Sequence, residues 1–257
     1  MSKPRGLLSA LSLSLALAAG PAGAEQPAVK LCYDDAPLYP WRTADGRGLD
    51  FALLDLAQKR AGVHFVLTAL PWKRCLSEVQ QGKQDGAVAA SFKNERMEIG
   101  VYPMVGDNPD PKRRMRTESY SLFRVKGSNV HWDGKTIHGA SGPVGVQLGY
   151  SIADQLKASG SAVEEGTARG ADIFRKMLLG RVSGAALLTQ EGDYLLRDPE
   201  FKARIERFPF PLAEKPYYLL FSKQFFAGSE PLARKIWDAL AAARDSAEFK
   251  KTEAAFE

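Results

Sequence analysis

The stretches Leu76–Ala90 (LSEVQQGKQDGAVAA) and Phe174–Leu188 (FRKMLLGRVSGAALL) align without gaps, which places Gly82 on Gly180. In both stretches a helical pattern ends at this glycine, a basic residue follows, and a short apolar run comes next. Glycine is typical of a helix end, and a short apolar run bounded by turn residues is typical of a buried strand. Because one copy lies in each half of the chain, the repeat predicts two similar lobes. The alternative is a chance match, since many helices end at glycine.

The residues around the first copy alternate between strand and helix patterns. Residues 29–33 form an apolar run, 49–57 place leucines on one helical face, and 63–67 alternate as in a second strand. The repeat then supplies a second helix and a third strand. This order, βαβαβ, predicts the parallel sheet of an α/β protein.

An exposed loop separates this unit from a second alternation of strands and helices. The loop, residues 106–116, contains two prolines, two aspartates and four basic residues and has no apolar period. The elements expected after it are strands at 120–125, 144–147 and 216–222, a helix at 152–158, and two late helices, one starting at Ser229 and one around Phe249.

The composition is that of a folded globular protein. Of 257 residues, 45% are hydrophobic and 25% are charged, which excludes a collagenous or disordered chain. The length allows one large domain or two smaller ones.

The first 24 residues have the pattern of a secretory signal peptide. Lys3 and Arg5 precede an apolar stretch at 7–19, and residues 22–24 (AGA) form a small-residue cleavage site. The alternative is a membrane anchor, although the apolar stretch is short for one. Removing the signal peptide lowers the formal net charge from +5 to +3, because two basic residues leave. We therefore expect a periplasmic protein with no nucleic-acid partner.

The two cysteines are expected to form a disulfide. Exported proteins with few, even-numbered cysteines usually oxidise them, which predicts a bond between Cys32 and Cys75. The alternative is two buried free thiols. The three histidines, His64, His131 and His138, are not at zinc-binding spacing, so we expect neither a metal nor a cofactor.

The motifs resemble those of a known family, the type 2 periplasmic solute-binding proteins of family 3, which bind polar amino acids. Trp72–Gly86 (WKRCLSEVQQGKQDG) resembles the family's helix and Gly-Lys-x-Asp, and Asn94–Arg96 (NER) resembles its Thr-x-Glu-Arg stretch. Further segments resemble the family's and follow one another in the same order along the chain. They are Asp35 with 40–41, 48–51 (GLDF), 144–149 (VGVQLG) and 217–223 (YYLLFSK).

The resemblance implies an α/β periplasmic binding protein-like II (Venus-flytrap) fold, with two lobes and two hinge crossings. Lobe 1 is expected at 25–119 plus 214–257 and lobe 2 at 120–213. It also implies a monomer without enzymatic activity that binds a small, carboxylated, amino-acid-like ligand between its lobes. Such a protein delivers the ligand to an inner-membrane ABC permease.

The family's ligand carboxylate is held by an arginine that corresponds to Arg96. A guanidinium presents two parallel donors to a carboxylate, which gives a strong pair. The alternative for Arg96 is a surface ion pair with Glu95 or Glu98. The Ser91 hydroxyl is expected to donate to the same carboxylate, or else to cap the short helix that follows.

Four further residues are candidates for contact with the ligand. Tyr150 and Ser151 open a lobe 2 helix, whose free N–H groups favour an anion, although Gly149 before them also fits a plain tight turn. Tyr39 and Trp72 lie where the family has aromatic residues that stack on the ligand. The alternative for both is a place in the core.

One departure from the family concerns the ligand's amino group. Amino-acid-binding members carry an aspartate for it where the repeat alignment puts Thr189. Gln190, Glu191 or Asp35 are the substitutes that the chain offers, and Arg74 is a further candidate for the cleft, or else solvated. The departure indicates a carboxylated or polar ligand other than a standard α-amino acid, with a basic amino acid left open.

Two other functions stay open. A few proteins of this fold are cyclohexadienyl dehydratase-like lyases, for which Glu191 or Asp35 would be the general acid, but the sequence offers no paired carboxylates and no nucleophile with a base. A sensory or accessory protein would bind the same ligand and dock on a receptor.

Overall fold

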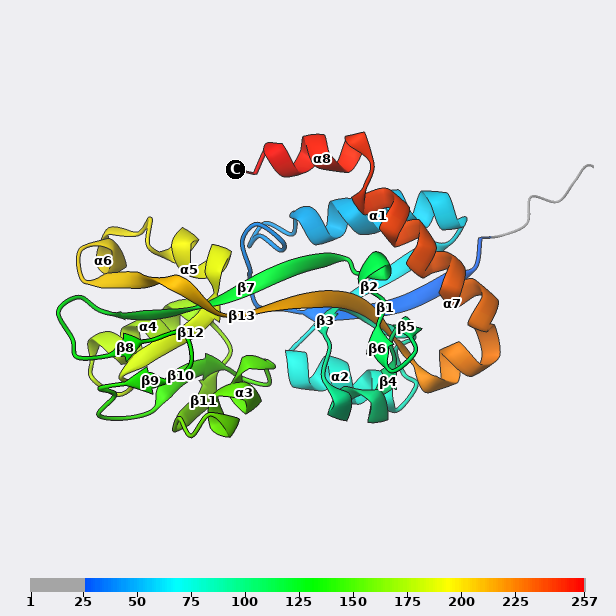
Figure 1. Ribbon diagram of the computed structural model, residues 1–257. Helices are drawn as coiled ribbons and strands as arrows, with labels where there is room; N and C mark the ends of the chain where they lie inside the picture. The colour runs from blue at the N-terminus through cyan, green and yellow to red at the C-terminus, as the bar shows by residue number, and fades with distance from the viewer. Residues whose placement is uncertain (1–25, 257) are drawn as a thin grey trace, which may run out of the picture.

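The computed structural model describes residues 26–256, and the predicted signal peptide at 1–24 lies outside the described residues. The chain forms two α/β lobes that lie side by side and share one sheet (Figure 1). The expected two-lobed α/β architecture is confirmed.

The first half contains the predicted βαβαβ unit. Its elements are β1 (Ala28–Asp34), α1 (Leu49–Ala61), β2 (His64–Leu70), α2 (Trp72–Gln80) and β3 (Gly86–Ser91). The strands are parallel in the order β2-β1-β3. All six residues of β3 are buried, as its apolar sequence predicts.

The second half repeats this arrangement. Its elements are β10 (Val144–Gln147), α3 (Ile152–Ala158), β11 (Val163–Thr167), α4 (Gly170–Leu178) and β12 (Gly184–Leu188). The strands are again parallel, in the equivalent order β11-β10-β12. The sequence repeat therefore corresponds to α2–β3 and α4–β12.

The repeated glycines have the same physical role in both units. Gly82 and Gly180 each have φ of +70°, a left-handed conformation that disfavours other residues. A Cβ atom on Gly86 would lie 2.8 Å from the Leu220 carbonyl oxygen, and one on Gly184 would lie 3.3 Å from that of Phe123. The glycines thus allow the helix to turn and the next strand to pack closely.

Two long antiparallel strands join the halves. They are β7 (Arg116–Val125) and β13 (Ile205–Ser222), which pair with each other along most of their length. β7 pairs with β12 from Tyr120 onward, and β13 pairs with β3 from Tyr217 onward. The two crossings lie at the centre of Figure 1, while the exact lobe limits at residues 119/120 and 213/214 stay a prediction.

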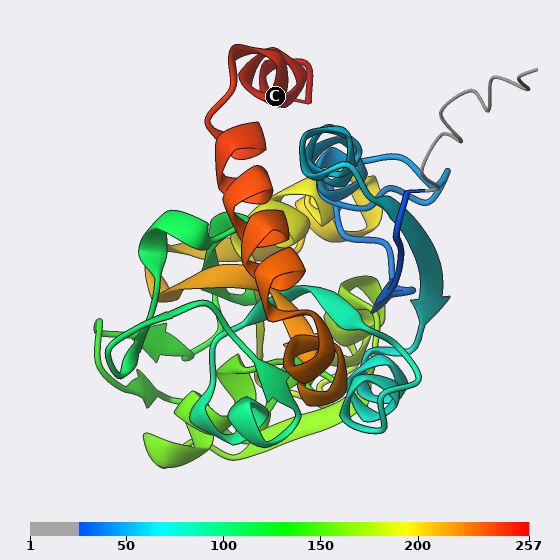
Figure 2. The same cartoon turned by 90° about the vertical axis from the view of Figure 1, so that its right-hand side faces the viewer.

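The remaining elements surround this framework. α7 (Lys223–Arg244) comprises two helical segments that meet at a kink, where Ser229 has a non-helical backbone, so the helix start expected there is confirmed. α7 and α8 (Ala247–Ala254) pack against α1 of the first lobe (Figures 1 and 2). The short elements are η1 (Asn94–Glu98), β4 (Gly100–Val101), β5 (Met104–Val105), β6 (Asn108–Pro109), η2 (Pro111–Arg113), β8 (His131–Trp132), β9 (Ile137–His138), α5 (Thr189–Leu195) and α6 (Pro199–Lys202).

The predicted disulfide is confirmed. Cys32 of β1 and Cys75 of α2 are bonded, with their Cα atoms 5.6 Å apart. Both residues are fully buried. The bond fastens α2 to the sheet beside the end of β1.

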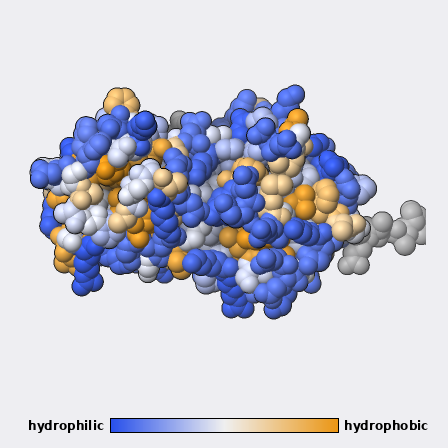
Figure 3. Space-filling model, turned by 60° about the horizontal axis from the view of Figure 1, so that its bottom comes forward, coloured by the Kyte–Doolittle hydropathy of each residue, from blue (hydrophilic) through white to orange (hydrophobic). Residues whose placement is uncertain are grey.

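Apolar side chains at the surface are scattered over the described part of the chain. No helix in residues 26–256 is long and apolar enough to cross a bilayer. On the face shown in Figure 3, apolar residues form separate patches among hydrophilic ones. The most exposed large apolar side chains, Val105, Leu179 and Phe210, belong to different parts of the fold.

Candidate functional site

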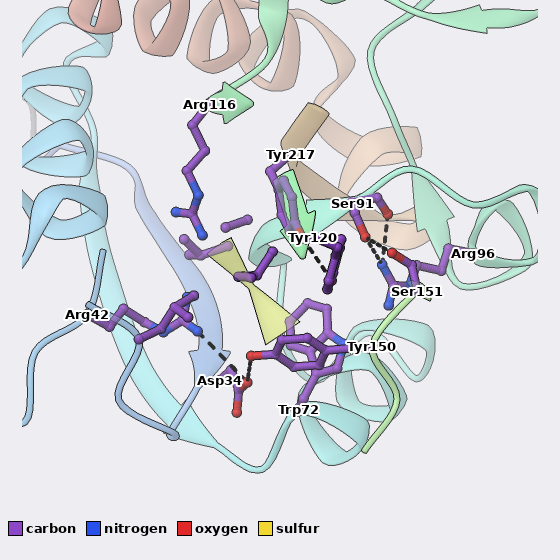
Figure 4. Close-up of a pocket in the computed structure, with 14 residues that line it drawn as sticks. Asp34, Arg42, Trp72, Ser91, Arg96, Arg116, Tyr120, Tyr150, Ser151 and Tyr217 are labelled. Carbon is purple, nitrogen blue, oxygen red and sulfur yellow. Dashed lines mark hydrogen bonds and ion pairs between the residues drawn. The ribbon is translucent and has the colours of Figure 1, made fainter. Parts of the chain in front are cut away.

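A small pocket lies between the two lobes, where strands of both halves end. β1 ends there at Asp34, β3 at Ser91 and β12 at Leu188. Carboxyl ends of strands are the usual ligand sites of open α/β sheets. The cavity is about 20 Å³, which is room for about one water molecule. The residues around it are Asp34, Leu38, Arg42, Trp72, Val88, Ala89, Ser91, Arg96, Arg116, Tyr120, Tyr150, Ser151, Leu188 and Tyr217 (Figure 4).

Arg96 enters this pocket from the short helix η1. Its Nη1 donates to the Ser91 carbonyl oxygen at 2.7 Å and to the Ser91 hydroxyl at 2.9 Å. Its Nη2 donates across the lobes to the Gly149 carbonyl oxygen at 3.1 Å. Arg96 is only 4% exposed, whereas Glu95 and Glu98 face solvent, so the surface ion pair left open by the sequence is not formed.

The guanidinium of Arg96 forms no ion pair within residues 26–256. Its hydrogen bonds are to neutral oxygens, and it lies 5.4 Å from the centre of the Trp72 ring. A buried charge without a counter-charge is costly. The site is therefore chemically suited to an anion.

Two serines from opposite lobes meet beside Arg96. The Ser91 hydroxyl donates to the Ser151 hydroxyl at 2.8 Å, and Lys215 Nζ donates to the Ser151 carbonyl oxygen at 3.2 Å. Burial lowers the pKa of Lys215, and the nearby Arg96 charge lowers it further. Ser91 does not cap η1, whose N-cap is Lys93. This end of the pocket is rich in hydrogen-bond donors and positive charge.

A tyrosine and an aspartate make a second contact between the lobes. Tyr150 Oη donates to Asp34 Oδ2 at 2.8 Å, and Asp34 lies 3.8 Å from Arg42 Nη2. Burial raises the pKa of Asp34, partly offset by Arg42. Burial, with the Asp34 charge, also raises the pKa of Tyr150 well above its ordinary value. Gly149 precedes Tyr150 at φ +78°, so the tight turn expected here is present.

Two more buried arginines line the pocket away from Arg96. Arg42 Nη1 donates to Asp50 Oδ2 at 3.1 Å, and Arg116 Nη1 donates to the other oxygen of Asp50. The Arg116 guanidinium lies over the Trp41 ring, 4.1 Å from its centre, and 5.2 Å from that of Tyr217. One carboxylate on α1 thus positions two guanidinium groups.

Two buried carboxyl groups lie near the pocket without lining it. Burial raises the pKa of Glu118 to about 7, against the opposing effect of Arg116. Burial raises the pKa of Glu191 to about 8, against a hydrogen bond from Gln147 Nε2 at 3.1 Å. Both groups hold protons more tightly than ordinary glutamates. No group of three metal-ligating side chains occurs in the described part of the chain.

The structure brings five of the predicted site residues together and leaves five apart. Those around the pocket are Trp72, Ser91, Arg96, Tyr150 and Ser151. Those elsewhere are Asp35, Tyr39, Arg74, Thr189 and Gln190.

The five outlying residues have other surroundings. Arg74 is exposed and pairs with Glu78 on its own helix, and Asp35 and Gln190 are exposed as well. The Tyr39 ring stacks on Tyr194, with centres 4.3 Å apart. Thr189 bonds to Ser121 and to the Ser119 carbonyl oxygen.

Sequence reasoning missed the acid and two of the three arginines in the pocket. Asp34 precedes the chosen Asp35 and is the last residue of β1, so the rule that ligands bind at strand ends points to it. Arg42 and Arg116 stand in segments that look like polar loops, and nothing in their local pattern indicates burial. The neighbour of Thr189 that lines the pocket is Leu188, so β12 offers no carboxylate there.

No protein-family model matches the chain, and no curated protein matches it in sequence. Solved structures do match its fold. The GluR0 ligand-binding core from Nostoc punctiforme, in complex with L-glutamate, aligns with a TM-score of 0.69 at 13% identity, over 89% of this chain and 98% of that one. The arginine-, lysine-, histidine-binding protein ArtJ from Geobacillus stearothermophilus aligns with a TM-score of 0.69 at 17% identity, over 89% and 94%.

A third match is an ancestral amino-acid-binding protein, AncCDT-1, described as a precursor of cyclohexadienyl dehydratase. It aligns with a TM-score of 0.67 at 17% identity, over 89% of this chain and 95% of that one. These identities are too low to transfer a function, but the coverage includes both lobes. The chain therefore has the two-lobed Venus-flytrap fold that its sequence motifs resemble.

Proposed function

We propose that the protein binds a small solute through a carboxylate, in the pocket between its two lobes. The observation that carries this proposal is Arg96, a buried guanidinium without an acidic partner among the described residues. A ligand carboxylate beside it would supply the missing counter-charge and accept two parallel hydrogen bonds. Ser91 and Ser151 are the hydroxyl donors nearest to that position.

The surroundings of Arg96 fit an organic anion better than a metal or a polyanion. Trp72 and Tyr150 supply aromatic walls, and Asp34 is the one acid among the described residues that line the pocket. The similar structures contain amino acids, namely L-glutamate in the Nostoc protein and arginine or glutamine in an ancestral arginine-binding protein. All of these ligands carry a carboxylate.

The ligand must enter through an opened form of the protein. A cavity of about 20 Å³ holds no organic acid, and contacts such as Tyr150–Asp34 and Arg96–Gly149 join the lobes across it. We propose a hinge motion at β7 and β13, which are the two connections between the lobes. Lobe 1 would comprise 25–119 plus 214–257, and lobe 2 would comprise 120–213.

We place the protein in the periplasm as a monomer that delivers its ligand to an inner-membrane ABC permease. The signal-peptide pattern and the Cys32–Cys75 disulfide support an oxidising compartment. One similar structure is described as an amino acid ABC transporter substrate-binding protein from Streptococcus pneumoniae. A sensor is the alternative partner, since a two-lobed domain of Bordetella pertussis BvgS also matches.

The geometry favours binding over catalysis. Of the two acids offered for a dehydratase-like lyase, Asp35 is exposed and Glu191 is buried beside Gln147, and neither lines the pocket that holds Arg96. A general acid must reach the proton acceptor on the substrate. The lyase alternative therefore lacks the two acids offered for it, and the acid among the described residues that line this pocket is Asp34, which accepts from Tyr150 and lies 3.8 Å from Arg42.

Calorimetric titration of a panel of small carboxylic acids and amino acids tests the proposal. We expect at least one acid to bind the wild type, and Arg96→Ala to weaken it about 100-fold or more, because a charge-assisted bidentate pair is lost. Arg74→Ala, a change at an exposed arginine, is the matched control and should leave the affinity unchanged. Equal affinity in the wild type and Arg96→Ala would contradict the proposed role of Arg96.

A further inference from the structure

The end of the pocket away from Arg96 holds more hydrogen-bond donors than acceptors. Arg42 and Arg116 are each only 5% exposed, and within residues 26–256 each guanidinium makes one hydrogen bond, to the shared carboxylate of Asp50. A guanidinium has five N–H groups. Most of the donor capacity of this pair is therefore unused inside the protein.

The unused donors include buried atoms without any partner. The Nε atoms of both Arg42 and Arg116 are inaccessible to solvent and have no hydrogen-bond acceptor. Two other acids are close but beyond hydrogen-bond range, Asp34 at 3.8 Å from Arg42 and Glu118 at 3.9 Å from Arg116. Buried unpaired donors cost free energy, and an acceptor that the protein does not itself supply is one explanation for them.

The two arginines face Arg96 across the pocket. In Figure 4, Arg42 and Arg116 lie on one side, Arg96 with Ser91 and Ser151 lies on the other, and Tyr120 and Tyr150 lie between them. Asp50 on α1 holds Arg42 and Arg116, and η1 carries Arg96, so all three arginines belong to the first lobe, whereas Ser151 comes from the second. A ligand with acceptors at its two ends would span them.

Building on the proposed function, we infer that the ligand carries a second carboxylate, bound by Arg42 and Arg116 at the end opposite Arg96. The class is that of small aliphatic dicarboxylates, with or without an amino group. Asp50 keeps one nitrogen of each guanidinium and orients the pair, so the remaining nitrogens form a fork that matches a carboxylate. Asp34, the acid that lines the pocket in residues 26–256, would accept from a hydroxyl or amino group between the two carboxylates.

Pairs of acids and their monoamides test this inference. We would titrate glutamate against glutamine, aspartate against asparagine, and succinate against succinamate into the full mature protein. In at least one pair the acid should bind about 10- to 100-fold more tightly, since the amide replaces a charged acceptor by a neutral group with two donors. A preference for the acid in the succinate pair alone would show that the ligand lacks an amino group. A preference in the amino-acid pairs alone would show that the ligand has one.

Substitution of Arg42 assigns the preference to a residue. In Arg42→Gln the affinity for the acid should fall to that for the monoamide, whose own affinity should change little. Arg42→Lys keeps a positive charge beside Asp50 but lacks the planar guanidinium, so it should lose part of the preference for the acid. This variant replaces Arg42→Gln in the test if Arg42→Gln lowers the Tm of the ligand-free protein. Arg74→Gln, at an exposed arginine, should keep the full preference.

Two results would overturn the inference and leave the proposed function intact. In the first, the monoamides bind the wild-type protein as tightly as the acids do, and Arg96→Ala still weakens that binding. In the second, Arg42→Gln weakens the binding of acid and monoamide equally. Absence of binding by every acid and every monoamide would overturn the proposed function and this inference together.

Discussion

Glu191 illustrates how burial outweighs hydrogen bonding in setting the pKa of a side chain in this fold. It lies in the first turn of α5, accepts a hydrogen bond from Gln147 on Oε1, and has its Oε2 buried without a partner. Its pKa is raised from 4.5 to about 8, because burial disfavours the charged form. At neutral pH the folded protein therefore holds this carboxyl group mainly protonated.

The raised pKa of Glu191 predicts a fall in stability as pH rises. Between about pH 4.5 and 8 the folded chain keeps a proton that the unfolded chain releases, so the free energy of unfolding decreases with pH in that window. Glu191→Gln cannot titrate, and we expect it to gain stability relative to the wild type, on the order of a few kcal/mol, from pH 5 to pH 8. Urea unfolding at both pH values measures this difference.

The difference in stability between the wild type and Glu191→Gln isolates the effect of Glu191. Glu118 also has a raised pKa, of about 7, and contributes to the fall in both proteins, so only the difference between them reports on Glu191. A constant difference between wild type and Glu191→Gln across the pH range would show that the carboxyl group is ionised in the folded protein.

Single residues were predictable from the sequence where a motif fixes the position. Arg96 and Ser91 lie in the pocket as the motif resemblance implies. Asp35 and Thr189 each missed the pocket by one residue, since Asp34 and Leu188 line it instead. Side chains at a strand end alternate in direction, so an error of one residue moves a side chain to the opposite face.

At the scale of elements, the disulfide joins β1 to α2 next to the pocket. It closes a loop across a sequence separation of 43, which in the chain-entropy model stabilises the fold by roughly 4 kcal/mol. We expect Cys32→Ala/Cys75→Ala to lose about that much free energy of unfolding, measured with guanidinium chloride. Reduced wild type, which keeps both side chains, separates the loss of the bond from the loss of packing. Equal stability of oxidised and reduced wild type would contradict the prediction.

Elements with a clear apolar period were predicted, and irregular ones were not. The βαβαβ order and the helix Ile152–Ala158 follow from pattern alone. β13 begins at Ile205, although the sequence predicted a strand only at 216–222. The earlier part was not predicted because Pro209 and Pro211 interrupt the apolar pattern. Its pairing with β7 shifts register around these prolines. Tertiary pairing with a long neighbour extends this strand beyond what its local sequence favours.

At the scale of the molecule, several polar contacts and one aromatic stack join the two lobes. The polar contacts include Tyr150 to Asp34, Ser91 to Ser151, Arg96 to Gly149, Lys215 to Ser151 and the ion pair of Lys93 with Asp154, and the stack is that of Tyr39 on Tyr194. Each contact is small in energy compared with the folding of a lobe. A ligand between the lobes would replace several of them with its own bonds, and this exchange would let binding drive the opening and closing of the hinge.

A crystal structure of the protein with the carboxylic acid that binds most tightly tests the central claim most directly. The account predicts the ligand between the two lobes, with carboxylate oxygens about 2.7–2.9 Å from the Arg96 guanidinium nitrogens. A ligand bound elsewhere, or one whose carboxylate avoids Arg96 while Arg96 still donates to Ser91 and Gly149, would contradict it.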